Sequence, residues 1–344
     1  MTHPVPHPVS SAAAVRDAAA AGRHGPAGPP ATWRELVHAA ADRLTAAGVA
    51  TASTDAELLA AHAAGLDRGR LRVALLTGAG PVPGAAARFA AAVDRRARRE
   101  PLQHITGTAP FRHLQLAVGP GVFVPRPETE LLAGWAVAAA AAALGARGTG
   151  HPLSAGTAGR TPARGPDPVH VVDLGTGSGA IAAAVATEVP GVTVLAVEVD
   201  PAAADWARRN LDPLGVPVLL ADGGCLPELR PDLCGAVDVV VTNPPYIPLD
   251  AWESVPVEVR DHDPAAALWG GSDGLDTVRW LLRCARRLLR PGGVVGIEHA
   301  DVQGASVPAL LAGDGGFARV RDHRDLTDRP RFTTAVRTPM GPGR

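Results

Sequence analysis

The chain has 344 residues, enough for two compact domains, and a formal net charge of −1. This near-neutral balance excludes a protein that a global electrostatic field would hold on nucleic acid or on an anionic membrane. Three cysteines without paired spacing argue against a disulfide framework or a cysteine metal site, and we predict a reduced, cytoplasmic protein.

The first hundred residues divide into a tail and a helical region. Residues 1–30 lack the leucine-rich core of a signal peptide, and we expect a disordered tail. Residues 31–100 show helical periodicity. Thr32-Trp-Arg-Glu35 and Thr54-Asp-Ala-Glu57 form two capping boxes before apolar stripes, and a third helix is expected to begin at Pro83. These patterns predict a small helical bundle.

The third helix would end in a basic run, which consists of Arg95, Arg96, Arg98 and Arg99. Basic side chains complement the negative end of the helix dipole. We therefore interpret the run as a solvated helix end rather than as a patch that binds a partner.

Residues 101–132 have the pattern of a hairpin linker. Leu114, Leu116 and Val118 alternate with other residues before the turn Gly119-Pro120-Gly121, which predicts a β-hairpin. Pro127 suits the first turn of a following helix. Arg126, between two prolines, is expected to pair with Glu128 or Glu130.

Two segments after the linker have unusual compositions. Residues 131–146 are apolar but too short and too rich in alanine for a membrane span. Residues 145–168 are rich in Gly, Pro, Ala and Thr without periodicity, which predicts a flexible insertion.

Residues 133–344 are predicted to form one α/β domain. Candidate strands at 169–174, 192–199, 216–222, 237–243 and 292–300 are separated by helical segments. This rhythm predicts a mostly parallel sheet with helices on both faces. Ligands of such sheets bind beyond the carboxyl ends of the strands.

A glycine-rich turn follows the first of these strands. Gly175, Gly177 and Gly179 would let the chain turn tightly and bring backbone N–H groups against a ligand. With Glu198 downstream, the spacing also fits a dinucleotide-binding fingerprint. Asp173 favours S-adenosylmethionine instead, because its carboxylate attracts the cationic end of that cofactor and would repel a pyrophosphate. The pattern D-x-G-x-G-x-G is similar to that of class I S-adenosylmethionine-dependent methyltransferases.

The tetrapeptide Asn243-Pro244-Pro245-Tyr246 follows the strand at 237–242. An amide or exocyclic amino nitrogen is a poor nucleophile because its lone pair is delocalised. The Asn243 side-chain oxygen and the Pro244 carbonyl would accept its two hydrogens, while Tyr246 would offer a flat face for stacking. The motif predicts methylation of such a nitrogen, and leaves protein glutamine, adenine and guanine open.

Further stretches resemble one family in the same order along residues 31–340. EPLQHITG (100–107), FVPRPETELL (123–132) and RDLTDRPRF (324–332) are similar to those of the N5-glutamine methyltransferases that modify peptide-chain release factors. The resemblance implies a Rossmann-like domain that uses S-adenosylmethionine, and a helical domain that docks the substrate. It implies the glutamine of the Gly-Gly-Gln loop of a release factor as the methyl acceptor, with no membrane and no nucleic-acid substrate. A nucleic-acid amino methyltransferase, a methyltransferase for ribosomal-protein glutamine and a non-catalytic binding factor remain as alternatives.

The resemblance also implies roles for individual residues. The cofactor would contact Asp173, Gly175, Thr176, Gly177, Ser178, Gly179, Glu198, Asp222, Gly223 and Asn243. The substrate would contact Phe123, Asn243, Pro244, Pro245 and Tyr246, of which Asn243, Pro244 and Tyr246 would be catalytic; a core role for Phe123 stays open.

Some family members carry a tryptophan at the position of Gly223, so that stacking contact is expected to be missing here. His104 and His299 are expected to be structural, and no metal site is predicted.

Overall fold

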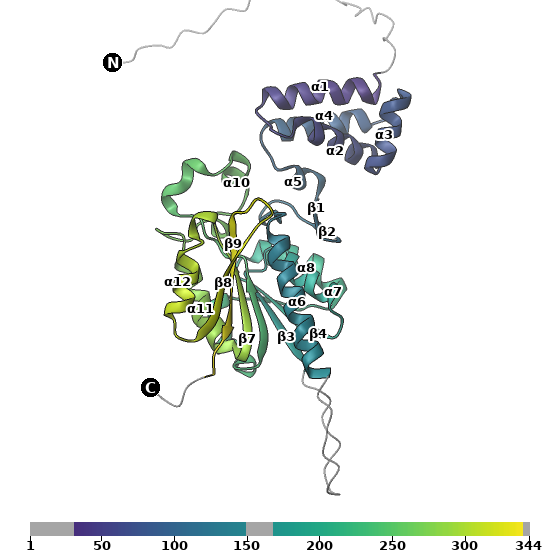
Figure 1. Ribbon diagram of the computed structural model, residues 1–344. Helices are drawn as coiled ribbons and strands as arrows, with labels where there is room; N and C mark the ends of the chain where they lie inside the picture. Colours follow the sequence, from purple (N-terminus) through teal and green to yellow (C-terminus); the bar gives the residue numbers. More distant parts are fainter. Residues whose placement is uncertain (1–30, 149–167, 340–344) are drawn as a thin grey trace, which may run out of the picture.

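The computed structural model describes residues 31–148 and 168–339 (Figure 1). The tail predicted at 1–30 and most of the insertion predicted at 145–168 lie outside these ranges. Residues 145–148 are an exception, since they form the last turn of α6 (Thr129–Gly148) and are not a loop.

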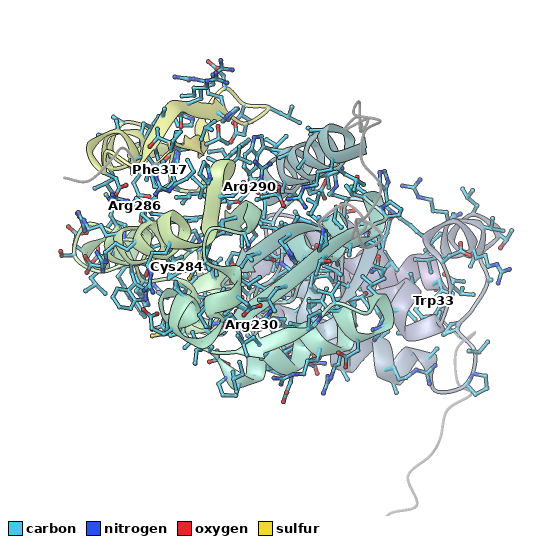
Figure 2. All side chains as sticks on the ribbon, turned by 90° about the horizontal axis from the view of Figure 1, so that it is seen from below. Trp33, Arg230, Cys284, Arg286, Arg290 and Phe317 are labelled. Atoms are coloured by element: carbon cyan, nitrogen blue, oxygen red, sulfur yellow. The ribbon has the colours of Figure 1, made fainter. Side chains whose placement is uncertain are left out.

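Four helices form the N-terminal domain around a core of their own: α1 (Trp33–Ala46), α2 (Ala52–Ala64), α3 (Arg68–Thr77) and α4 (Ala85–Ala97). The first capping box is confirmed, because the Thr32 hydroxyl accepts from the Glu35 N–H and the Glu35 carboxylate accepts from the Thr32 N–H. The second is wrong, because α2 already begins at Ala52 and makes no side-chain cap. Helix α3 was not predicted. In Figure 2 this domain, labelled by Trp33, lies at the opposite end of the molecule from Phe317.

The linker begins with α5 (Leu102–Thr106) and continues into a hairpin of β1 (Thr108–Phe111) and β2 (Leu114–Ala117). The predicted hairpin is confirmed, but its turn is wrong. Arg112, with a φ of 51°, turns the chain between the two strands, and Gly119-Pro120-Gly121 follows the second strand. Asn210 fixes where β2 ends, because its side chain accepts from the Ala117 N–H and donates to the Ala117 carbonyl.

A seven-stranded sheet forms the centre of the second domain, with the order β5-β4-β3-β6-β7-β9-β8. All neighbouring pairs are parallel except those that include β9. The predicted α/β fold is therefore confirmed. The strands are β3 (Val169–Leu174), β4 (Val192–Glu198), β5 (Val218–Leu220), β6 (Val237–Thr242), β7 (Leu289–Glu298), β8 (Phe317–Arg324) and β9 (Pro330–Arg337).

Helices cover both faces of this sheet (Figure 1). One face packs against α6, α7 (Ala180–Glu188) and α8 (Pro201–Leu211), and the other against α11 (Asp276–Leu288) and α12 (Ser306–Gly313), with the short α9 (Leu226–Leu229). The β6 strand is buried at every position, as expected of a central parallel strand.

Helix α6 is longer than the apolar segment predicted from the sequence. By length and composition, residues Thr129–Arg147 would suffice to cross a membrane, and they are the one such helix within the described ranges. Leu132, Ala133, Ala136 and Ala140 are nevertheless fully buried against the sheet. The apolar face of α6 therefore serves the core of the domain.

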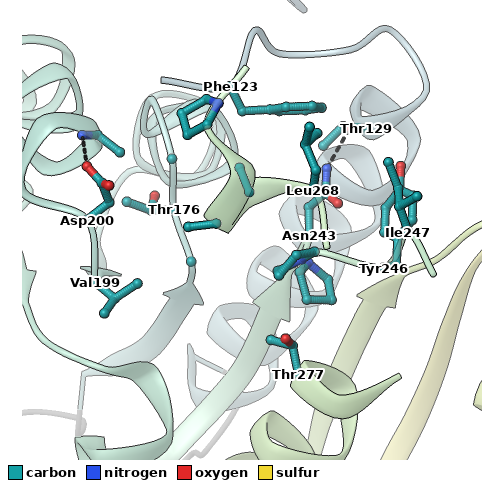
Figure 3. A pocket seen from close by; sticks show the side chains of 18 of the residues that line it. Phe123, Thr129, Thr176, Val199, Asp200, Asn243, Tyr246, Ile247, Leu268 and Thr277 are labelled. Carbon is teal, nitrogen blue, oxygen red and sulfur yellow. Dashed lines mark hydrogen bonds between the residues drawn. The ribbon is translucent and has the colours of Figure 1, made fainter. Parts of the chain in front are cut away.

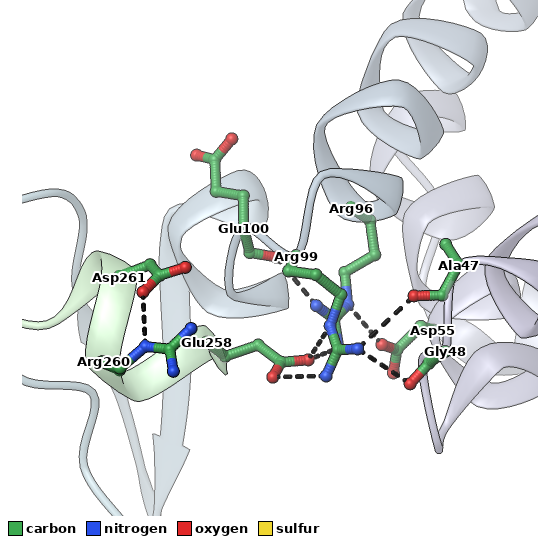
Figure 4. A network of polar contacts seen from close by, with 9 residues as sticks. All are labelled: Ala47, Gly48, Asp55, Arg96, Arg99, Glu100, Glu258, Arg260 and Asp261. Carbon is green, nitrogen blue, oxygen red and sulfur yellow. Dashed lines mark hydrogen bonds and ion pairs between the residues drawn. The ribbon is translucent and has the colours of Figure 1, made fainter. Parts of the chain in front are cut away.

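The basic run at the end of α4 joins the two domains, which corrects the prediction of a solvated helix end (Figure 4). Arg96 is buried and pairs with Asp55 at 2.7 Å. Arg99 binds both oxygens of Glu258, in α10 (Val257–His262), at 2.8 and 2.7 Å, and Arg96 reaches the same carboxylate at 3.2 Å. The run is thus an interdomain ion-pair network.

Candidate active site

A cavity of about 1080 Å³ opens beyond the carboxyl ends of β3, β4 and β6. The topology places it there because parallel strands present their carboxyl ends at one edge of the sheet. It is lined by nearly all the residues predicted for the site: Phe123, Asp173, Gly175, Thr176, Gly177, Ser178, Glu198, Asp222, Gly223, Asn243, Pro244, Pro245 and Tyr246. Gly179 is the exception.

The glycine loop turns tightly between β3 and α7. Gly175 and Gly177 have φ values of 68° and 58°, which other residues rarely adopt, and the space where their side chains would project is open. Gly179, with a φ of 85°, caps α7 instead, and a Cβ there would lie 2.9 Å from the Leu211 side chain. The structure gives Gly179 a packing role, and its cofactor contact stays a prediction.

Glu198 ends β4 and is held by three backbone N–H groups. Its Oε2 accepts from Gly177 at 2.8 Å, while its Oε1 accepts from Val199 at 2.9 Å and from Asp200 at 3.0 Å. A carboxylate offers about four lone-pair positions, so room remains for a ligand hydroxyl. The loop and the carboxylate thus fix each other in place.

Asp173, the penultimate residue of β3, lines the same cavity and is almost fully buried. Its Oδ2 accepts from the Thr176 hydroxyl at 2.6 Å and from the Ala182 N–H at 3.1 Å. Its Oδ1 is buried without a hydrogen-bond partner among the described residues. Burial raises the pKa of Asp173 to about 6 against the lowering effect of these hydrogen bonds. A cationic ligand group would satisfy the unpaired oxygen and stabilise the charge.

Asn243 follows β6 and presents its amide to the cavity (Figure 3). Its Nδ2 donates to the hydroxyl of Thr129, the first residue of α6, at 3.1 Å. No described residue donates to the Asn243 side-chain oxygen or to the Pro244 carbonyl. Two acceptors are therefore available side by side in the chain, as the motif predicts.

Tyr246 is half-buried and also lines the cavity. Its backbone carbonyl accepts from the side chain of Gln303 at 3.0 Å, which anchors the end of the Asn-Pro-Pro-Tyr segment. Burial raises the pKa of the Tyr246 hydroxyl, so the phenol stays neutral.

Phe123 and Arg126 bring the linker to the cavity wall. The Arg126 guanidinium lies 4.8 Å from the centre of the Phe123 ring and pairs with Asp263 at 2.7 Å. The prediction that Arg126 pairs with Glu128 or Glu130 is wrong, since the favoured partner lies 137 residues away in the chain.

Asp222 and Gly223 line the cavity beyond β5, next to a tryptophan that the sequence did not indicate. Trp280, from α11, donates through its indole N–H to Asp222 Oδ1 at 3.0 Å and lies over Gly224, where a Cβ would be 1.5 Å from that nitrogen. An aromatic ring therefore stands beside Asp222 and Gly224, the neighbours of Gly223, where the sequence predicted that a stacking contact would be missing.

His104 and His299 are buried, do not line the cavity and contact other protein groups, as expected of structural histidines. His104 Nε2 lies 3.3 Å from the Val122 carbonyl, and His299 bridges the Ala300 carbonyl and the Thr333 hydroxyl at 2.9 Å each. Burial lowers the pKa of both rings. Within 31–148 and 168–339, no group of His, Cys, Asp and Glu side chains could hold a metal ion.

A mostly parallel sheet, a glycine loop locked to a strand-end carboxylate and an Asn-Pro-Pro-Tyr segment meet in one cavity. This combination defines a Rossmann-like methyltransferase. Two family models agree with it: residues 35–107 match the PrmC N-terminal domain, and residues 164–253 match the methyltransferase small domain.

Relatives over nearly the full length define the family. The release factor glutamine methyltransferase of Streptomyces coelicolor is 51% identical, over 86% of this chain and 95% of that protein. The enzyme of the same name from Mycolicibacterium smegmatis is 47% identical, over 88% and 97%. The chain belongs to the release factor glutamine methyltransferase family. A more distant relative, 41% identical over 89% of this chain and 95% of its own length, is a 4-amino-L-phenylalanine/4-methylamino-L-phenylalanine methyltransferase of Streptomyces pristinaespiralis.

Proposed function

We propose that the chain methylates the side-chain amide nitrogen (N5) of the glutamine in the Gly-Gly-Gln loop of peptide-chain release factors, in the cytoplasm. The observation that carries this proposal is the pair of available acceptors, the Asn243 side-chain oxygen and the Pro244 carbonyl, in a cavity beside the glycine loop. Membership of the family supports release factors as the protein substrate.

The cavity residues fit S-adenosylmethionine as the methyl donor. The unpaired Asp173 oxygen suits its cationic amino group, Glu198 suits its ribose hydroxyls, and Gly175 and Gly177 leave open space along its length. We assign the surface of Asp222, Gly223 and Trp280 to the adenine ring. When bound, this cofactor supplies a methyl group on a positively charged sulfur, which leaves as a neutral thioether.

The Asn-Pro-Pro-Tyr segment then prepares the nucleophile. Asn243 and Pro244 each accept one N–H of the substrate amide, which aims the nitrogen lone pair at the methyl group. Both oxygens also stabilise the positive charge that develops on nitrogen as the N–C bond forms. The fixed φ of Pro244 and Pro245 holds the carbonyl in place before the substrate arrives. The nitrogen finally releases one proton to water and becomes a neutral N-methyl amide.

The N-terminal domain is proposed to dock the release factor. Through Arg96 and Arg99 it holds Glu258 of α10, and the neighbouring Val255, Pro256 and Val259 line the cavity. A protein that binds the helical domain would therefore lie next to the cavity wall.

A primary aromatic amine is a second candidate substrate, because a relative at 41% identity is named for one. An aromatic amine shares with an amide two N–H hydrogens and a delocalised lone pair, so the same two acceptors would serve it.

A methyl-transfer assay distinguishes these substrates. The enzyme and S-adenosylmethionine with a labelled methyl group are incubated separately with a release factor, with DNA, with RNA and with 4-amino-L-phenylalanine. We expect label in the release factor and none in a release factor whose Gly-Gly-Gln glutamine is replaced by alanine. Label in nucleic acid or in the amino acid, with none in protein, would contradict the proposal.

A further inference from the structure

Three residues from separate elements, Asn243, Thr129 and Glu298, are linked by hydrogen bonds, and Figure 3 shows the one between Asn243 and Thr129. Asn243 follows β6, Thr129 begins α6 and Glu298 ends β7. Asn243 Nδ2 donates to the Thr129 hydroxyl at 3.1 Å, and this hydroxyl lies 3.1 Å from Glu298 Oε1. Thr129 and Glu298 are 4% and 1% exposed, so water has little access to these hydrogen bonds.

The orientation of an asparagine amide is decided by its neighbours. Its oxygen and its NH₂ group are similar in size, and half a turn about the last side-chain bond exchanges them. With the oxygen toward the cavity, Asn243 accepts from the substrate nitrogen. With the NH₂ group there, two donors would face each other and the charge developing on nitrogen would be destabilised.

The Glu298 carboxylate decides which group donates and which accepts in each of these hydrogen bonds. An ionised Glu298 only accepts, so the single Thr129 hydrogen points to it. The Thr129 oxygen must then accept, and the group that donates to it is the Asn243 NH₂. The Asn243 oxygen is left facing the cavity.

We propose that Thr129 and Glu298 are positioning residues, which hold the Asn243 amide with its oxygen toward the substrate nitrogen. The kinetic part of this inference rests on the proposed function, whereas the orientation itself does not.

The burial of Glu298 supports a role of this kind. Its Oε2 has no hydrogen-bond partner among the described residues, which is costly for a buried carboxylate and unhelpful for stability alone. Burial raises the pKa of Glu298 to about 7. Hydrogen bonding from Thr129, the charge of Arg331 in β9 and hydrogen bonding from Asn243 oppose this increase, whereas Glu128, before α6, adds to it; the neutral Tyr246 lies nearby.

A Glu298 protonated on Oε1 would itself donate to Thr129 and release the threonine hydrogen toward the Asn243 oxygen. The productive orientation is therefore present above the pKa of Glu298 and is lost as the pH falls through about 7. The rate of the chemical step should rise with pH across this window in the wild type. In Glu298→Gln, which is neutral at every pH, this rise should disappear.

Nuclear magnetic resonance tests the orientation without a substrate. The sequence contains two asparagines, Asn210 and Asn243, so ¹⁵N labelling of asparagine side chains gives two NH₂ pairs. In Thr129→Val, which removes the hydroxyl and keeps the shape, the Asn243 pair should shift and exchange faster with water. The Asn210 pair, bonded to the Ala117 and Ser178 carbonyls, should not change and reports that the fold is intact. Thr129→Ser should restore the Asn243 signals.

The second experiment measures the rate at which the enzyme methylates a release factor. Thr129→Val should lower kcat about tenfold, less than removal of the Asn243 side chain, with unchanged affinity for S-adenosylmethionine. Thr129→Ser should return most of the rate. An Asn243 pair that stays unchanged in Thr129→Val would overturn the inference, as would a wild-type kcat in that variant. If the wild-type enzyme were inactive on release factors, the proposed function would be refuted. The nuclear magnetic resonance experiment would still decide how the Asn243 amide is oriented.

Discussion

The interdomain network around Glu258 offers a direct test of how the helical domain is held. Glu258→Gln keeps the size of the side chain and removes its charge. The substitution leaves Arg96 paired with Asp55 and leaves Arg99 bonded to the Ala47 and Gly48 carbonyls. The two guanidinium contacts of Glu258 are therefore the main interactions that weaken (Figure 4).

The pKa of Glu258 sets the size of the effect. Burial alone would raise this pKa, but hydrogen bonds from Arg99, from the backbone and from Arg96 outweigh burial and lower it from 4.5 to about 2. That difference corresponds to about 3.4 kcal/mol at most. The side chain is 21% exposed, so solvent screening reduces the contribution, and we expect Glu258→Gln to lose about 1–2 kcal/mol of unfolding free energy at pH 7.

Urea unfolding of the wild type and the variant gives the measurement. Glu253→Gln is the matched control, since Glu253 is exposed on the same segment and forms no ion pair with a described residue. Because the folded pKa is lowered, the contribution of Glu258 is present above pH 4.5 and lost as the pH falls toward 2. The difference from the wild type should therefore shrink between pH 5 and pH 3. Equal stability of the two variants at pH 7 would refute the reasoning.

Three further substitutions test the site. Asn243→Ala should lower kcat by roughly 10²–10³-fold with little change in the affinity for S-adenosylmethionine. Single-turnover kinetics would measure the rate and calorimetry the affinity. A wild-type rate would remove Asn243 from the mechanism. Glu198→Gln should weaken cofactor binding about 10- to 100-fold in calorimetry, because a charge-assisted acceptor for the ribose is lost, and unchanged affinity would show that the ribose lies elsewhere. Trp280→Ala should weaken cofactor binding about 2- to 10-fold and Trp280→Phe should recover part of it, whereas equal losses in both would argue against stacking.

Local patterns in the sequence predicted the centre of the catalytic domain. The runs VVDL before Gly175 and VVVT before Asn243 belong to buried strands. Their apolar residues are consecutive, so the local sequence is enough to predict a buried strand. The glycine loop and the Asn-Pro-Pro-Tyr segment follow these strands directly, so their convergence follows from a parallel sheet. At the C-terminal end, β8 and β9 form a hairpin that we did not predict, because the solvated β8 has few apolar positions.

Most of the errors around the site concern residues whose partners lie far along the chain. Arg96 meets Glu258 across 162 positions, and Thr129 meets Glu298 across 169, so no local pattern in the sequence indicates either pair. Trp280 has the spacing of an ordinary amphipathic helix, and only the packing of α11 brings it to Asp222. The hairpin turn was misplaced because glycine and proline favour turns, whereas Arg112 adopts its positive φ under tertiary contacts with Glu130 and Glu188.

The central claim is that Asn243 and Pro244 direct a methyl group to one glutamine nitrogen. Mass spectrometry tests it most directly, through fragmentation of a release factor treated with S-adenosylmethionine and either the wild-type enzyme or Asn243→Ala. We expect one added methyl group, located on the side chain of the Gly-Gly-Gln glutamine, with the wild type and almost none with the variant. A methyl group on another residue, or equal modification by both enzymes, would contradict the account.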